Sequence, residues 1–175
     1  PTRIPYLYDI VSIASGIDHN LCLNTSGDVH GFGCNRSGQL GIDDVISVLI
    51  PVKIISKIRK IDCGGTYSIF YDYSHRVWMC GDNRSGQMGF DDPVCIGTPR
   101  LCEHFDNMEI IPSSEHTFAI SPEGDIYSCG RNEAHQCGQP KQQLVNGATN
   151  FVKLPYISFK LIHGTKSATS TFTKN

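Results

Sequence analysis

A long segment recurs along this chain of 175 residues, and the recurrence constrains the fold more than any other feature. Residues 11–44 read VSIASGIDHNLCLNTSGDVHGFGCNRSGQLGIDD, and residues 59–92 align with them without gaps as RKIDCGGTYSIFYDYSHRVWMCGDNRSGQMGFDD. A third copy, MEIIPSSEHTFAISPEGDIYSCGRNEAHQCG, covers residues 108–138. Self-similarity at a fixed period of this length indicates a solenoid or a propeller.

The copies also predict how the chain is divided. Residues 151–169 resemble residues 51–69, which indicates that a further copy begins near the end of the chain. We therefore expect five segments: an outgoing strand of a preceding unit at 1–10, repeat 1 at 11–58, repeat 2 at 59–107, repeat 3 at 108–158, and the start of a fourth repeat at 159–175.

Within each copy the apolar residues alternate with a period of two. HNLCL at 19–23, YSIFY at 67–71 and HTFAI at 116–120 have the pattern of half-buried strands. The turn signals TSG and PEG follow two of them and predict hairpins. One strand before and one after each hairpin give four strands per copy, as in a propeller blade. The predicted fold is therefore all-β, a partial β-propeller of four-stranded blades.

The motif N-x-x-G-Q-x-G follows the third predicted strand in the first two copies. Glycine takes a positive φ without steric cost, and asparagine bonds nearby backbone, so the motif predicts a structural turn between strands. A glycine-rich phosphate loop would need a helix after it, and none is predicted. The predicted turn residues are Asn35, Gly38, Gln39, Gly41, Asn83, Gly86, Gln87 and Gly89.

These landmarks form one longer pattern, which in the first copy comprises Gly16, His19, Leu21, Leu23, Gly27, Val29, Gly33, Asn35, Gly38, Gln39, Leu40 and Gly41. The pattern resembles the repeat of the regulator of chromosome condensation family. The resemblance implies a seven-bladed β-propeller, of which this chain would form about half. Later copies depart from the pattern, with Tyr67 for histidine, His75 and Ser113 for glycine, and His135 for the turn glycine.

A half-ring would leave apolar flanks and unpaired strand edges at both ends. We therefore expect this piece, which does not begin with methionine, to belong to a longer propeller protein. Self-association of half-rings is the alternative.

The leading functional hypothesis is a protein–protein interaction module, because propeller loops present variable residues on a rigid frame. The resemblance implies partners such as small GTPases or proteins of the chromatin and ubiquitin pathways. The alternative is guanine-nucleotide exchange on a Ran-like small GTPase, although no inserted wedge between blades is evident. In the founding family member, an acidic residue before the repeat histidine lies on the face that meets the GTPase.

The candidate partner-binding residues at that motif position are Asp18, His19, Glu115 and His116. A second interpretation stays open for each pair. The acids are also typical of solvated turns. The histidines are also typical of structural hydrogen bonding between strands, since no nucleophile stands at a matching spacing.

Other function classes lack support in the sequence. Lys+Arg 15 against Asp+Glu 17 gives a net charge of -2 with no basic block, so direct nucleic-acid binding is not expected. The apolar runs are too short to span a membrane. No hydrolase or metalloprotease motif is present, so we expect neither an enzyme nor catalytic residues. The acidic pairs Asp43–Asp44 and Asp91–Asp92 are interpreted as turn-capping residues rather than a cation site.

The eight cysteines form no C-x-x-C pair, so neither a zinc site nor another metal or cofactor is expected. Cys80 and Cys129 occupy the place of Phe32 in the first copy, which indicates a buried apolar position. Reduced thiols are typical of an intracellular protein, cytoplasmic or nuclear.

Overall fold

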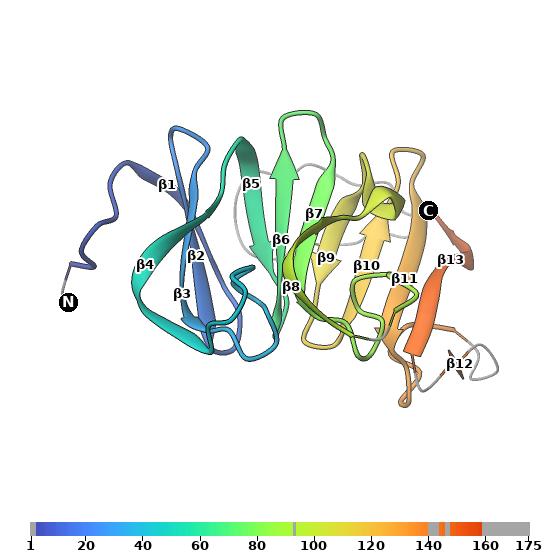
Figure 1. Cartoon of the computed structure of the whole chain (residues 1–175). Coiled ribbons are helices and arrows are strands. Elements are labelled where there is room, and N and C mark those ends of the chain that lie inside the picture. Colours follow the sequence, from blue (N-terminus) through green and yellow to red (C-terminus); the bar gives the residue numbers. More distant parts are fainter. Residues whose placement is uncertain (1–2, 93, 140–143, 146–147, 159–175) are drawn as a thin grey trace.

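The computed structural model describes residues 3–92, 94–139, 144–145 and 148–158, and it confirms the all-β prediction. Three antiparallel sheets stand side by side in chain order, as successive blades of a partial propeller (Figure 1). The described residues contain no α-helix, only a single 3-10 turn at Glu103–Phe105. They include no helix long and apolar enough to cross a membrane.

Each of the first two sheets has four strands in the order of the chain. The first sheet consists of β1 (Ile10–Ser15), β2 (His19–Asn24), β3 (Val29–Cys34) and β4 (Ser47–Ile55). The second consists of β5 (Ile58–Cys63), β6 (Tyr67–Asp72), β7 (Val77–Asp82) and β8 (Cys95–Leu101).

The third sheet repeats this order and adds a short strand at its outer edge. It consists of β9 (Glu109–Pro112), β10 (His116–Ile120), β11 (Asp125–Arg131) and β13 (Ala148–Ser158), with β12 (Leu144–Val145) paired to β13. The register is the same in all three sheets. The glycine near the end of the third strand faces the first residue of the second strand, in the pairs His19–Gly33, Tyr67–Gly81 and His116–Gly130.

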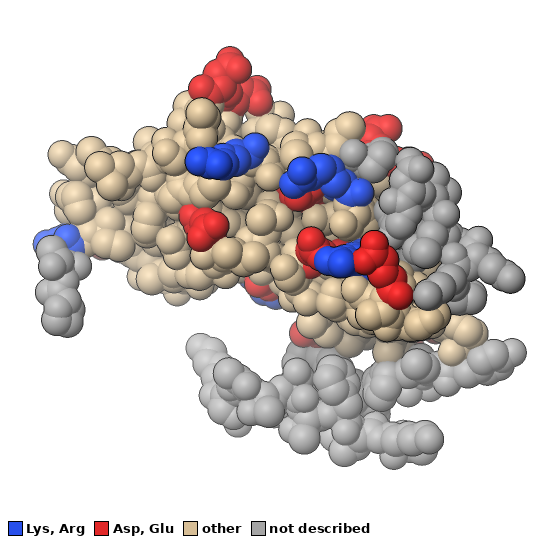
Figure 2. Space-filling view, turned by 90° about the horizontal axis from the view of Figure 1, so that it is seen from below, with Lys and Arg blue, Asp and Glu red and all other residues tan. Residues whose placement is uncertain are grey.

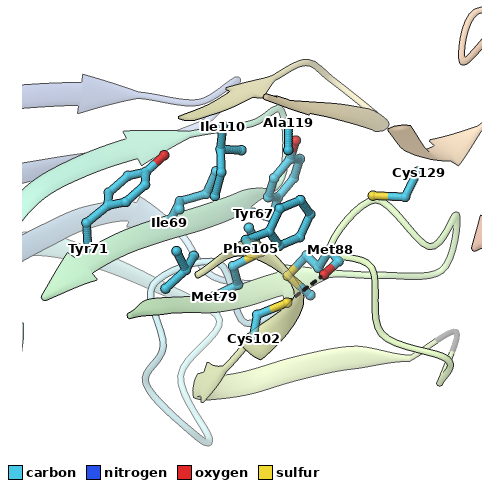
Figure 3. Packing of buried hydrophobic residues seen from close by; sticks show 11 residues of the cluster. Tyr67, Ile69, Tyr71, Met79, Met88, Cys102, Phe105, Ile110, Ala119 and Cys129 are labelled. Carbon is cyan, nitrogen blue, oxygen red and sulfur yellow. Dashed lines mark hydrogen bonds between the residues drawn. The ribbon is translucent and has the colours of Figure 1, made fainter. Parts of the chain in front are cut away.

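Two apolar cores lie between neighbouring sheets. Leu21, Leu40 and Phe70 belong to the core between the first and second sheets, and all three are fully buried. The core between the second and third sheets is larger and contains two tyrosines and two methionines (Figure 3). The buried residues of that core are Tyr67, Ile69, Tyr71, Val77, Met79, Met88, Cys102, Phe105, Ile110, Ala119 and Cys129. Burial of apolar area between sheets is therefore the main force that joins the blades.

Two positions marked by the sequence can be compared directly with the structure. Cys80 and Cys129 are fully buried, as the exchange with an aromatic residue predicted. Of the outgoing strand predicted within residues 1–10, the described residues 3–9 form no strand before β1 begins at Ile10, although the Asp9 carbonyl oxygen accepts the Thr25 backbone N–H at 3.0 Å. The predicted fourth repeat, 159–175, lies outside the described residues.

Candidate protein-binding face

The loops at one end of the three sheets form a common surface, which we call the loop face. It consists of the β1–β2, β5–β6 and β9–β10 turns together with the long loops that follow β3, β7 and β11 (Figure 1). Seen from this end, acidic and basic side chains are intermixed and separated by uncharged surface (Figure 2). No single sign of charge dominates the view, which suits a protein partner better than a nucleic-acid backbone.

An asparagine at the start of each long loop holds the loop together. The Asn83 amide donates to the carbonyl oxygens of Phe90 (3.1 Å) and Asp92 (2.7 Å), and its own oxygen accepts from the Met88 backbone N–H at 2.9 Å. Asn35 and Asn132 make the same bond to the amide five residues later. The predicted turn is thus a loop closed by one buried amide side chain.

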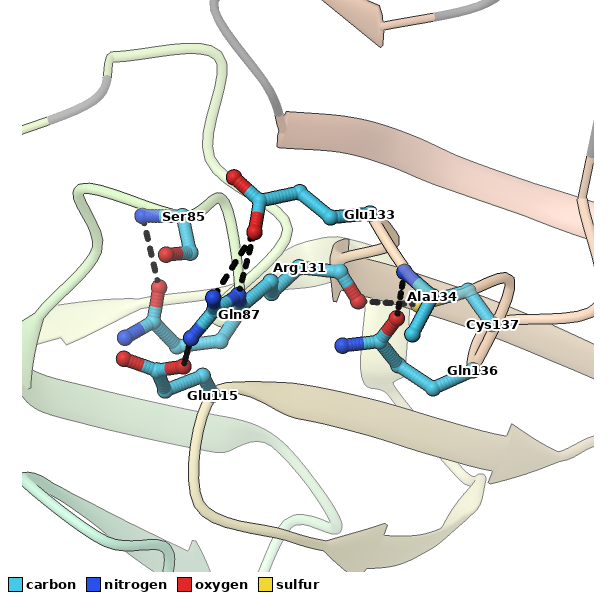
Figure 4. A network of polar contacts seen from close by, with 8 residues as sticks. All are labelled: Ser85, Gln87, Glu115, Arg131, Glu133, Ala134, Gln136 and Cys137. Atoms are coloured by element: carbon cyan, nitrogen blue, oxygen red, sulfur yellow. Dashed lines mark hydrogen bonds and ion pairs between the residues drawn. The ribbon is translucent and has the colours of Figure 1, made fainter. Parts of the chain in front are cut away.

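A glutamine closes the first turn within each loop. The side-chain oxygen of Gln87 accepts the backbone N–H of Ser85 at 3.0 Å, and Gln136 accepts that of Ala134 at 2.9 Å (Figure 4). His135 replaces the turn glycine of the third loop and adopts a positive φ of 61°, so the turn keeps its shape without glycine.

A chain of hydrogen bonds connects each loop to the next sheet. The Ser68 hydroxyl donates to the Gln39 carbonyl oxygen at 2.6 Å, and it lies 2.9 Å from His19 Nε2. Since the only hydroxyl proton of Ser68 is engaged with Gln39, His19 Nε2 must be the donor in the second bond. The imidazole of the first blade therefore donates a hydrogen bond to a hydroxyl of the second blade.

The second interface repeats this arrangement with different side chains. The Thr117 hydroxyl donates to the Gln87 carbonyl oxygen at 2.6 Å and accepts from the Tyr67 hydroxyl at 2.7 Å. Tyr67 thus replaces histidine without loss of the connection. Ser68 and Thr117 carry no distinguishing signal in the sequence, although each directly follows the repeat histidine position.

The hydrogen bond with Ser68 places the His19 side chain in the interface between blades and not on the surface that a partner would contact. Its side chain is only 1% exposed, so it offers no atom to a partner, and its role is structural. Burial lowers the pKa of His19 to about 4, although the nearby Asp18 carboxylate acts in the opposite direction. A charged imidazolium in this position would be desolvated, which is why the neutral ring is favoured.

This pKa predicts an acid-dependent loss of stability to which His19 contributes. In the unfolded chain histidine titrates near 6.5, so between about pH 6.5 and 4 the unfolded state binds a proton that the folded state excludes. The free energy of unfolding should therefore fall as the pH drops through this window, by up to about 1.4 kcal/mol per pH unit. His19→Tyr, which copies Tyr67, should reduce this slope in urea unfolding measured from pH 7 to 4, and burial of His116, which also lowers the pKa of that residue, leaves a residual slope of the same sign.

The matched control is His135→Asn, which changes an exposed histidine and should leave the slope intact. An unchanged slope in His19→Tyr would contradict the assignment of the slope to His19.

His116 is placed differently from the other two residues of its position. A Cβ atom at Gly16 would collide with the His19 ring, and one at Gly64 would collide with the Tyr67 ring. The third repeat has Ser113 at that position, so the ring of His116 cannot lie in the same place. It is half-buried and packs edge-on against Phe118, with ring centroids 5.7 Å apart.

The two predicted acidic residues have different surroundings. Glu115 is paired with Arg131 Nη1 at 2.6 Å, and the same guanidinium binds Glu133 at 2.7 Å (Figure 4). Asp18 is exposed, and its carboxylate makes no ion pair or hydrogen bond within the described part of the chain. Of the two, only Asp18 presents a carboxylate that a partner could pair with directly.

The acidic pairs after the loops contact neighbouring strands. Asp92 lies 3.4 Å from Arg100 of β8, and the Asp43 carboxylate approaches Gly97 of the next sheet so closely that a Cβ there would collide with it. Among the described residues, no group of three or more histidine, cysteine and acidic side chains could hold a metal ion.

Comparison with known proteins identifies the repeat. Two sequence models described as the regulator of chromosome condensation (RCC1) repeat match the chain, one over residues 26–71 and one over residues 10–39 and 58–87. The chain belongs to the RCC1-repeat family. The matches at 10–39 and 58–87 each cover the first three strands of one sheet, whereas the match at 26–71 runs from β3 of the first sheet to β6 of the second and so spans parts of two blades.

Curated relatives of this RCC1-repeat chain include several proteins of different description. The mouse regulator of chromosome condensation is 27% identical over 83% of this chain, and the ultraviolet-B receptor UVR8 of Arabidopsis thaliana is 30% identical over 74%. The guanine nucleotide exchange factor SRM1 of Saccharomyces cerevisiae is 27% identical over 99%. These matches cover 37%, 31% and 37% of the relatives, so the chain spans about a third of their length.

Solved structures agree with this assignment. Prp20p of Saccharomyces cerevisiae, described with its binding properties to Gsp1p and histones, superposes with a TM-score of 0.77 and 26% identity. The match covers 91% of this chain and 42% of Prp20p. Yeast RCC1 (Prp20) bound to Kap60 superposes equally well, with 27% identity.

Proposed function

We propose that this RCC1-repeat chain is a protein-interaction module whose binding surface is the loop face. The supporting observation is that every blade presents the same rigid loop, fixed by a buried asparagine, but with different charged residues beside it. The first blade carries Asp18 and Arg36, the second an Asp82–Arg84 pair, and the third the Glu115–Arg131–Glu133 network. A fixed frame with variable exposed residues is how a repeat protein acquires a specific partner.

A second candidate function is guanine-nucleotide exchange on a Ran-like small GTPase. It is supported by the unpaired carboxylate of Asp18 at the family's partner-facing position, and by the exchange-factor name of the relative SRM1. In both proposals the chain acts by binding, and no covalent step is assigned to it. Proteins of the chromatin and ubiquitin pathways stay alternative partners. Self-association of half-rings also stays a prediction, which light scattering on the chain would test.

The candidate functions can be tested on a Ran-like GTPase loaded with fluorescent GDP. We expect the chain to bind this GTPase, and we expect Asp18→Asn to weaken the affinity about tenfold, since it removes an accessible interface charge. Glu115→Gln should have a smaller effect, because Arg131 already neutralises that carboxylate. Surface plasmon resonance measures the affinity, and the release of fluorescent GDP measures exchange.

The matched control is Glu123→Gln, which removes one exposed acidic charge at the opposite end of the sheets and should not alter binding. Binding without faster GDP release would support the interaction module and exclude exchange by this chain. Absence of binding would remove the GTPase as the partner.

We also propose an intracellular setting. Free thiols are present at Cys22, Cys34, Cys63, Cys80, Cys95, Cys102 and Cys129, and four of these are buried, namely Cys22, Cys80, Cys102 and Cys129. Unpaired thiols persist where the surroundings are reducing.

A further inference from the structure

Four residues of the second repeat depart from the corresponding residues of both other repeats, and all four lie around one pocket. These residues are Arg59, Lys60, Tyr71 and His75; the first repeat has Val11, Ser12, Leu23 and Gly27 in their places, and the third has Met108, Glu109, Ile120 and Gly124. The pocket has a volume of about 290 Å³ and is completed by Asn107, Met108 and Glu109. His75 places the pocket beside the β6–β7 hairpin, and this hairpin lies at the end of the sheets opposite the loop face (Figure 1).

His75 is held in a backbone conformation that suits glycine. It has a φ of 62°, whereas the other two repeats have Gly27 (79°) and Gly124 (89°) at this hairpin tip. A side chain in this region costs about 1 kcal/mol relative to glycine. The histidine is therefore less favourable than glycine at this tip, as are other residues of the chain with a positive φ such as Lys57 and His135, and what distinguishes His75 is its contact with Arg59.

The strained histidine lies beside an arginine that a β-bulge directs into the pocket. The register between β5 and β6 shifts between Ile58 and Lys60, which makes Arg59 the bulged residue. Arg59 Nε donates to the Asp72 carbonyl oxygen at 3.0 Å, and Nη2 donates to His75 Nδ1 at 3.3 Å. The first sheet has the same bulge at Val11, so the arginine, and not the bulge, distinguishes the second repeat at this position.

Both cations of this pocket lie against the ring of Tyr71. Arg59 is 5.9 Å and the Lys60 ammonium 4.7 Å from the ring centroid. Tyr71 is only 2% exposed, and its buried hydroxyl has no hydrogen-bond partner among the described residues. A buried hydroxyl without a partner costs about 1–3 kcal/mol, so this wall of the pocket lacks an acceptor.

The lining of the pocket distinguishes between two kinds of anion. The Lys60 ammonium lies 3.8 Å from the Asp62 carboxylate, whereas Arg59 has no acidic partner among the described residues. Arg59, the imidazole and the unpaired hydroxyl together favour a group with negatively charged oxygen atoms. Glu109, on the wall formed by β9, would repel a free doubly charged phosphate, whereas it can accept a backbone N–H from a peptide. The combination therefore fits an acidic side chain that arrives with its own backbone.

We propose that the pocket between β5, the β6–β7 hairpin and β9 binds an acidic side chain of a peptide segment of a protein partner. Arg59 and Lys60 pair with the carboxylate, while Glu109 and Asn107 contact the peptide backbone. This site is separate from the loop face, so its failure and the failure of the proposed function can be told apart.

The test uses the isotopically labelled chain and a capped peptide of six glutamates, followed by NMR. We expect saturable shifts at the backbone amides of Arg59, His75 and Asn107, and none with a capped glutamine peptide or with inorganic phosphate. The variant Arg59→Val with His75→Gly takes both residues from the first repeat. It should bind the glutamate peptide at least tenfold more weakly, while its melting temperature stays equal or rises because the hairpin glycine is restored.

The matched control is Arg36→Val, which removes the same charge at the loop face and should leave the affinity unchanged. Three results would each overturn the proposal: no saturable shift with the glutamate peptide, equal shifts with inorganic phosphate, or an equal loss of affinity in Arg36→Val. A lower melting temperature in the double variant would show that the two side chains serve the fold instead.

Discussion

Gly81→Ala is expected to lower the free energy of unfolding by about 3–5 kcal/mol. Gly81 has a φ of 118°, a region that residues with a Cβ rarely adopt. An added Cβ would lie 2.5 Å from the Thr66 carbonyl oxygen and 2.6 Å from the Tyr67 Cα. Both neighbours are backbone atoms of the β5–β6 turn, so they cannot move aside as a side chain would.

The loss should appear as a lower midpoint in urea or thermal unfolding. For a chain of this size, 1 kcal/mol corresponds to about 2–4 °C, so a decrease of about 10 °C is expected. Gly138→Ala is the matched control, because Gly138 has a φ of 66° and an added Cβ there would meet Leu154 at an ordinary contact distance of 3.6 Å. Its loss should be only about 1–2 kcal/mol. Equal losses in the two variants would mean that φ alone, and not the close approach, decides the cost.

Gly81 also illustrates what could be predicted from the sequence. Gly33, Gly81 and Gly130 recur at fixed places because each must pass close to the turn before the second strand. The strands and the loop motif could be predicted in the same way, since every copy of the repeat must form the same strands and the same turn. The residues that these local structures require recur in every repeat, so aligning the chain with itself identifies them.

Contacts between blades were less accessible from the sequence. His19 and Ser68 are 49 residues apart, and the equivalent pair is Tyr67 with Thr117, so neither partner keeps one residue type. The repeat pattern left two interpretations of His19 open, contact with a partner and structural hydrogen bonding. Its 1% exposure and its hydrogen bond with Ser68 fit the structural interpretation.

Departures from the repeat were the other feature that the sequence did not explain. Tyr67 and His75 were both noted as mismatches in the second copy. The two mismatches differ in the structure. Tyr67 keeps the hydrogen bond to the next blade, whereas His75 lies at a pocket with Arg59 and Tyr71. A mismatch can thus be a compensated structural change or a specialised site, and only the spatial neighbours distinguish the two.

Asn83→Ala is expected to destabilise the chain by about 3–4 kcal/mol, because one buried side chain satisfies three backbone groups. The alanine variant would leave the Met88 amide and the carbonyl oxygens of Phe90 and Asp92 without these bonds. Asn83 is fully buried, so water cannot replace its amide without opening the loop. The urea midpoint should therefore fall, with an unchanged dependence on urea concentration.

Hydrogen exchange would locate the damage. The Met88 amide should lose protection in Asn83→Ala well beyond the global change, because the loop can then open while the sheets remain folded. Asn20→Ala is the matched control, since its side chain accepts a single exposed bond from Ser15, and it should change stability by no more than about 0.5 kcal/mol. If Asn83→Ala weakened only global stability and left the relative protection of Met88 unchanged, the asparagine would not be what fixes the loop. The rigid frame on which the proposed loop face depends would then need another source.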